Sequence, residues 1–153
     1  MENRLSWQKI TLKLRNPFRL SYGTSEERQA YWIRLRKDEG WGEGTIPPYY
    51  GFSADEMERF WLWAAKKQAP FPDDPSDIAV WIGDQGPAPA RCALDLAMHD
   101  RIARSQNVPL YQLLDLPYPE PKTSSFTIAL DTPTAMAEMA SCVKNFPILK
   151  VKL

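Results

Sequence analysis

The sequence predicts an α+β module followed by the beginning of a parallel α/β domain. Residues 1–116 show the alternation of strands and then the periodicity of helices, whereas residues 123–153 give a strand, a helix and a second strand. The stretch 116–122 between them is rich in proline, which can continue neither a helix nor a strand ladder. Two different architectures are therefore expected along one chain.

Size and charge narrow the class of protein. The chain has 153 residues, enough for a hydrophobic core, and its 19 basic and 19 acidic residues cancel. A neutral balance argues against a nucleic-acid partner. No apolar run reaches the ~18 residues of a membrane span, and the start lacks the apolar core of a signal peptide. We expect a cytoplasmic protein without a membrane partner, in which Cys92 and Cys142 are buried free thiols.

The first part of the module should be an antiparallel meander. Apolar and polar residues alternate over 8–15 and again over 30–37, and a short third strand follows at 41–45. The dozen residues between the first two strands, 17–28, are expected to form a long loop, and 46–52 a second irregular stretch.

Helices should follow the strands. Ser53 and Glu56 have the spacing of a capping box, and the helix they open ends before Pro70. A second helix is expected over 74–83, and a third opens at Pro89. The strands and helices should bury one core, formed by Ile10, Leu12, Ile33, Leu35, Phe60, Trp61, Leu94 and Met98.

The last thirty residues predict a βαβ unit. Residues 124–130 form a β-branched and apolar strand, Thr132 and Pro133 start a helix, and 148–153 form the second strand. A strand–helix–strand unit of this kind implies parallel pairing. The sequence stops inside the second strand, so we expect the polypeptide to continue beyond Leu153.

Two lysines mark that final strand. Lys150 and Lys152 are two residues apart, so their side chains should lie on one face. Neighbouring ammonium groups favour loss of a proton from one of them, as a general base requires. Alternating lysines also occur on exposed strands, where they discourage edge pairing. The pattern alone leaves both interpretations open.

Four segments together resemble a known family. They are Asn16-Pro17-Phe18-Arg19-Leu20-Ser21, then Gly40-Trp41-Gly42-Glu43-Gly44, then 93–100 with 108–114, and finally Ile148-Leu149-Lys150-Val151-Lys152-Leu153. In this order and spacing the chain resembles the enolase superfamily, and within it the muconate-lactonizing subgroup and its dipeptide epimerases. The resemblance implies an α+β capping domain, 1–116, joined to the start of a parallel (β/α) barrel, 123–153, that is truncated here, since such barrels need ~200 residues or more.

The resemblance also implies residue roles. Lys152 matches the family's base and Lys150 its partner, which lowers the affinity of that base for its proton and contacts the substrate carboxylate. Thr127 falls where the family lines its pocket, and Phe18 and Tyr22 lie in the mobile loop that covers it. Ligands for Mg²⁺ are expected beyond Leu153, with none in this chain. The sequence departs from the family pattern at Gly23, the position where epimerases selective for acidic dipeptides can carry an arginine.

The resemblance implies a Mg²⁺-dependent epimerase or racemase that removes the proton α to the carboxylate of a small substrate, for example a dipeptide. The alternatives are a muconate-type cycloisomerase, an enzyme like o-succinylbenzoate synthase, or a non-catalytic capping module that binds a partner. We expect a homo-oligomer when the protein is full-length, and no activity from the 153 residues alone.

Overall fold

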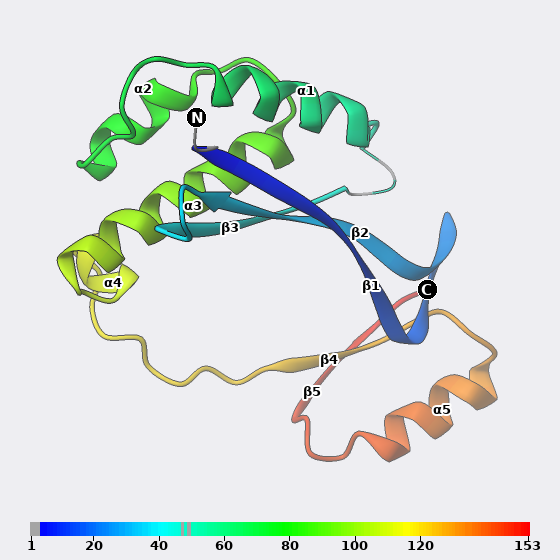
Figure 1. Cartoon of the computed structure of the whole chain (residues 1–153). Coiled ribbons are helices and arrows are strands. Elements are labelled where there is room, and N and C mark those ends of the chain that lie inside the picture. The colour runs from blue at the N-terminus through cyan, green and yellow to red at the C-terminus, as the bar shows by residue number, and fades with distance from the viewer. Residues whose placement is uncertain (1–3, 47, 49) are drawn as a thin grey trace. The chain divides into compact units, whose positions relative to one another are not determined.

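The chain folds into two compact units. The computed structural model describes residues 4–46, 48 and 50–153 (Figure 1). The first unit contains residues 4–11 and 29–118, and the second contains 12–28 and 119–153. The tip of the first hairpin is thus grouped with the C-terminal segment. The division into a capping domain, 1–116, and the start of a barrel, 123–153, comes from the family resemblance and stays a prediction.

A three-stranded sheet begins the chain. Its order is β1-β2-β3, with β2 and β3 antiparallel, as the predicted meander requires. The strands are β1 Leu5–Leu20, β2 Gly23–Leu35 and β3 Gly40–Thr45. The predicted loop over 17–28 is wrong, because β1 runs on to Leu20 and β2 begins at Gly23 after a turn at Ser21 and Tyr22. Pro17 is tolerated there since β1 is an edge strand, where a missing N–H need not break a ladder.

The second irregular stretch, 46–52, contains positions 47 and 49, which lie outside the described residues.

The helices of the first unit follow the predicted order. They are α1 Ala54–Ala65, the 3₁₀ turn η1 Pro75–Asp77, α2 Ile78–Ile82, α3 Ala88–Gln106 and the short α4 Leu110–Leu113. The predicted capping box is confirmed: the Glu56 amide donates to the Ser53 hydroxyl at 3.2 Å, and the Ser53 amide donates to the Glu56 carboxylate at 3.0 Å. None of the helices in the described residues is long and apolar enough to cross a membrane.

The glycine-rich strand β3 packs directly on α3. A Cβ built on Gly42 would lie 2.0 Å from the Ala93 carbonyl oxygen, and one on Gly40 would lie 2.2 Å from that of Ala97. Gly44 is nearly as close, with the Ala93 Cβ at 3.1 Å. Because Ala93 and Ala97 are one turn apart, the alternate glycines fit the small-residue stripe of the helix. The Gly-x-Gly pattern therefore has a packing role in this structure.

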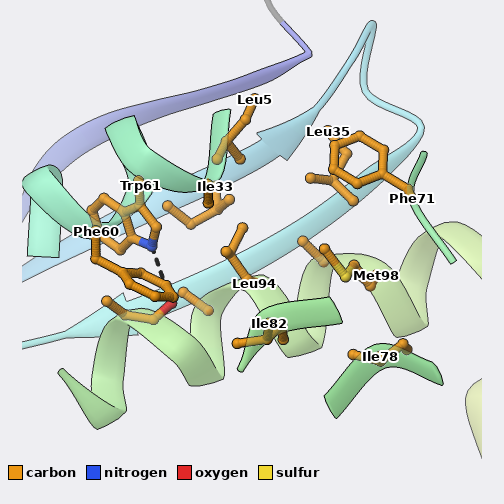
Figure 2. Packing of buried hydrophobic residues seen from close by; sticks show 14 of the residues in the cluster. Leu5, Ile33, Leu35, Phe60, Trp61, Phe71, Ile78, Ile82, Leu94 and Met98 are labelled. Atoms are coloured by element: carbon orange, nitrogen blue, oxygen red, sulfur yellow. Dashed lines mark hydrogen bonds between the residues drawn. The ribbon is translucent and has the colours of Figure 1, made fainter. Parts of the chain in front are cut away.

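The hydrophobic core lies between this sheet and the helices (Figure 2). Trp61 is fully buried, and its indole N–H donates to the Ala90 carbonyl at 3.0 Å, the bond drawn in Figure 2. Six of the predicted core residues are buried, namely Ile33, Leu35, Phe60, Trp61, Leu94 and Met98. Leu12 is an exception at 41% exposed, and Ile10 is half-buried, because β1 leaves the first unit after Thr11.

The cysteines also differ from expectation. Cys92 and Cys142 are free, as predicted, but both are exposed. Cys92 lies next to Ala93 on α3 and so points away from the stripe that packs on β3.

The second unit contains the predicted βαβ arrangement. Its elements are β4 Ser125–Ile128, α5 Pro133–Cys142 and β5 Ile148–Val151. The two strands pair in parallel. The Thr132 hydroxyl caps α5 by accepting from the Ala135 amide at 3.3 Å. The fold predicted from the sequence, an antiparallel meander followed by helices and then by parallel strands, is thus confirmed.

Candidate functional site

The parallel strands bring Thr127 beside Lys150. The register pairs Thr127 with Lys150 and Ile128 with Val151. Lys152 lies just past the end of β5, and its backbone amide still donates to the Ile128 carbonyl at 3.0 Å. Since side chains alternate along a strand, Thr127, Lys150 and Lys152 lie on the same face of the pair. We call this the lysine face.

The opposite face is used for packing. Phe126 contacts Phe146 with ring centroids 5.3 Å apart, and Ile128 is buried at 3% exposure. On the lysine face, Lys152 and Thr127 are half-buried and Lys150 is exposed. The polar groups of the lysine face therefore lie opposite the apolar side chains of Phe126 and Ile128.

A cleft of about 570 Å³ runs along the other edge of β4. Four consecutive residues of that region, 126–129, line it, so the cleft follows the strand edge rather than one face. The rest of its lining comes from the hairpin tip and from α5, with Leu14, Arg15, Asn16, Pro17, Phe18, Arg19, Arg28, Asp131, Ala135, Met136 and Met139. Its volume falls in the range of small-molecule sites.

The structure brings together some of the predicted site residues. Phe18 and Thr127 line the same cleft, and Thr127 pairs with Lys150. Lys150 and Lys152 are not part of the cleft lining, and Tyr22 lies in the hairpin turn at 64% exposure. The functional roles of all five residues stay predictions.

Sequence reasoning missed Arg19 and Asp131. These two lining residues of the cleft form an ion pair, and the Leu130 amide donates to the Arg19 carbonyl at 3.1 Å. The Thr132 amide donates to the second carboxylate oxygen of Asp131 at 2.8 Å. Arg19 and Asp131 are 112 positions apart in the chain, so no local pattern could have indicated this contact.

The described residues do not form a metal site. Mg²⁺ prefers several oxygen ligands in near-octahedral geometry. In the part of the chain that the structure describes, no group of three or more His, Cys, Asp or Glu side chains could hold a metal ion. Asp131, the acidic residue of the cleft lining, is bound to Arg19 and Thr132. A Mg²⁺ ion thus has no ligand set among these residues.

No family model matches the chain, but curated relatives do. L-Ala-D/L-Glu epimerase from Bacteroides thetaiotaomicron is 29% identical over 147 residues, which cover 93% of this chain and 38% of the relative. The Escherichia coli L-Ala-D/L-Glu epimerase is 30% identical, covering 92% and 44%. N-succinyl-L-Arg/Lys racemase from Bacillus cereus is 28% identical, covering 94% and 42%. The chain spans about two fifths of the length of these relatives.

Solved structures show the same relationship. A dipeptide epimerase from Enterococcus faecalis, complexed with Mg and L-Leu-L-Tyr, matches with a TM-score of 0.80 and 26% identity, over all of this chain and 46% of that one. The fold is also that of a dipeptide epimerase from Cytophaga hutchinsonii, with a TM-score of 0.82 at 24% identity, over 97% of this chain and 43% of that one. The resemblance predicted from the sequence is thereby confirmed: over almost its whole length, the chain is similar to dipeptide epimerases and an N-succinyl-Arg/Lys racemase of the enolase superfamily.

Proposed function

We propose that this chain supplies the capping module and first strands of an epimerase or racemase that acts on the carbon α to a carboxylate. The substrate class is a dipeptide or an N-acylated amino acid. Relatives of both kinds, the L-Ala-D/L-Glu epimerases and the N-succinyl-L-Arg/Lys racemase, support this choice. Because the chain covers only 38–44% of these relatives, activity would belong to a polypeptide that includes further residues.

One observation carries the proposal. The parallel register places Lys150 beside Thr127, and Lys152 follows on the same face. At about 3.3 Å per residue, two side chains on one face of a strand start about 6.6 Å apart. A base and a cation can thus reach adjacent atoms of one small ligand.

The proton transfer assigns each lysine a task. Lys152, as the free amine, takes the Cα proton; the C–H bond breaks and its electron pair moves into the carboxylate, giving an enediolate and an ammonium. The Lys150 ammonium donates to the carboxylate oxygens, where negative charge develops. A second acid on the opposite side of the carbon returns a proton to complete the inversion. We assign that acid to residues outside this chain.

Thr127, Phe18 and Tyr22 are proposed to bind the substrate. Thr127 adds a hydroxyl to the lysine face, and Phe18 lines the cleft that Thr127 also lines. Tyr22, at the exposed turn, would act only when the hairpin tip covers the bound substrate and excludes water.

The remaining parts of the proposal concern cofactor, assembly and location. Mg complexes among the structural neighbours support a Mg²⁺ requirement, with ligands outside the described residues. A homo-oligomer and a cytoplasmic location complete the proposal; two free cysteines fit a reducing compartment.

The proposal is tested by exchange of the α-proton. The polypeptide encoded by the complete gene would be incubated in D₂O with Mg²⁺ and, in turn, L-Ala-L-Glu, L-Leu-L-Tyr and N-succinyl-L-arginine, and loss of the Cα–H signal followed by NMR. We expect exchange with at least one of them. No exchange across the panel would contradict the proposal and favour a non-catalytic capping module.

Three lysine variants sharpen the test. Lys152→Arg keeps the charge but cannot lose its proton near neutral pH, so exchange from the face it serves should stop. Lys150→Ala should slow exchange and alter its pH dependence. Lys144→Ala, in the exposed turn after α5, is the matched control and should behave as wild type. Full activity in Lys152→Arg would show that this residue acts as a cation and not as the base.

A further inference from the structure

Two contacts within the second unit tie the tip of the β1–β2 hairpin to the segment after β4, and a third bond, inside that segment, orients one of the partners. The Arg19 guanidinium pairs with the Asp131 carboxylate. The Leu130 amide donates to the Arg19 carbonyl at 3.1 Å. The Thr132 amide donates to the other carboxylate oxygen of Asp131 at 2.8 Å and so fixes its orientation. Side chain and backbone of one arginine are therefore both bound to residues 130–131.

These ties lie next to the predicted substrate contacts. Phe18 precedes Arg19 in β1, and Thr127 is three residues before Leu130. All of Phe18, Arg19, Thr127 and Asp131 line the cleft. A contact that holds Arg19 at Leu130 and Asp131 therefore also keeps Phe18 in the lining of the cleft that Thr127 shares.

The ion pair is weak enough to open. The side chains of Arg19 and Asp131 are 44% and 38% exposed. Pairs this accessible contribute little, because water competes for both partners and salt screens their attraction. A buried pair would fix the hairpin tip permanently, whereas this one can bias it toward the docked state and still release it.

We propose that the Arg19–Asp131 pair is a reversible latch that positions the hairpin tip, and with it Phe18, at the end of β4. Both are positioning residues. The docked hairpin covers the cleft and the open hairpin admits or releases a ligand; that this ligand is the substrate rests on the proposed function. The latch itself is a property of the fold and is measurable without any catalysis.

The first test measures docking through the Leu130 amide, whose acceptor is the Arg19 carbonyl. Hydrogen exchange of this amide would be compared in the 153-residue chain and in Arg19→Gln. We expect exchange to rise by up to roughly fivefold, the range that an exposed ion pair can supply. Arg15→Gln is the matched control, because it removes a charge from the same strand and cleft but leaves the partner of Asp131 in place. Its Leu130 amide should exchange as in wild type.

A double-mutant cycle separates a latch from two independent effects. Asp131→Asn removes the charge and keeps an oxygen for the Thr132 amide. If Arg19 and Asp131 act as a pair, the double variant should exchange no faster than either single variant. In wild type, 0.5 M salt should speed Leu130 exchange toward the variant rate. Effects that multiply, or Leu130 exchange that is unchanged in Arg19→Gln, would overturn the latch.

The second test links the latch to ligand binding in the complete gene product. If α-proton exchange is detected, Arg19→Gln should raise KM with little change in kcat, and Arg19→Lys should restore part of the loss. A purely structural defect would lower the amount of folded enzyme and hence kcat at constant KM, which would also contradict the latch. If no substrate reacts, the proposed function fails, and the exchange measurements still decide the latch.

Discussion

The two units differ sharply in how much they bury. Among the described residues, every buried hydrophobic side chain except Ile128 lies in the first unit. Helix α3 contributes seven buried residues, whereas α5 contributes none and every residue of β5 is exposed. The candidate catalytic lysines, however, lie in the second unit. Stability and candidate chemistry are thus assigned to different parts of the chain.

This separation predicts which substitutions change the stability of the fold and which change the chemistry. Changes in the first unit should alter how much of the chain is folded, because its contacts form one continuous core. Changes on the lysine face should alter chemistry with little effect on that core. All six tryptophans, Trp7, Trp32, Trp41, Trp61, Trp63 and Trp81, lie in the first unit. Intrinsic tryptophan fluorescence therefore reports the unfolding of that unit alone.

The largest expected effect is at Trp61. Trp61→Ala removes a fully buried indole and its hydrogen bond to Ala90, and should cost about 3–5 kcal/mol of unfolding free energy. Urea denaturation followed by the remaining tryptophans measures this. Trp63→Ala, two residues on but 48% exposed, is the control and should cost about 1 kcal/mol or less. Equal losses would mean that Trp61 is not a core residue.

The next effect tests the glycine contact with α3. Gly42→Ala forces a methyl group to within 2.0 Å of the Ala93 carbonyl as the backbones stand, so strand and helix must separate. We expect a loss of about 1–3 kcal/mol, typical of overpacking. The neighbouring Glu43→Ala is exposed and should change stability by less than about 0.5 kcal/mol. A Gly42→Ala variant as stable as wild type would refute the close packing.

The capping box predicts an acid dependence. Hydrogen bonds from the Ser53 side chain and backbone hold the pKa of Glu56 below its usual range. A carboxyl with a depressed folded pKa stabilises the fold above its unfolded pKa, about 4.3, and loses that contribution as pH falls through the folded pKa.

Ser53→Ala should cost about 1 kcal/mol at pH 7, as is typical of a lost N-cap. The loss should be smaller at pH 3, because the hydrogen bonds to the Glu56 carboxylate lose their contribution as pH falls toward and through its folded pKa. Urea midpoints at the two pH values measure the difference. Ser105→Ala, whose hydroxyl donates to the Ile102 carbonyl, is the control and should show no comparable change with pH. A loss that is the same at both pH values would show that the Glu56 carboxylate does not contribute to the effect of Ser53.

The smallest expected effect is in the second unit. Met139→Ala trims a half-buried side chain of α5 that lines the cleft and lies outside the hydrophobic core. The unfolding free energy measured by urea denaturation and tryptophan fluorescence should change by less than about 0.5 kcal/mol. A shift comparable with that of Trp61→Ala would show that the two units unfold as one.

Local patterns predicted most of the first unit. The alternation of Tyr31, Ile33 and Leu35 placed the buried face of β2, and all three are fully buried. Ser53 and Glu56 predicted the start of α1, because a capping box depends only on neighbours three residues apart. Periodicity and helix caps depend on residues that are close together in the sequence, so they can be recognised without knowledge of the fold.

What the sequence did not predict depends on distant contacts. Proline, glycine and serine made 17–28 resemble a loop, but an edge position lets Pro17 stay in a strand. Leu12 fits the alternation of β1 and is still exposed, because β1 leaves the first unit, with its core, after Thr11. The edge cleft and the Arg19–Asp131 pair need the hairpin and β4 side by side, which no spacing encodes.

The predicted chemistry rests on the lysine pattern and on resemblance. The structure adds the register, which sets Thr127 beside Lys150. It does not add a metal site among the described residues.

Hydrogen exchange along the 153-residue chain tests the central comparison most directly. The amides of α3 over 90–104 lie under the core and should exchange slowly, at rates close to those set by global unfolding. The amides of β4, α5 and β5 should exchange much faster, because two paired strands are marginal alone and α5 buries no side chain. Slow exchange in both regions of a monomer would contradict the division between a self-supporting first unit and a weakly held second unit.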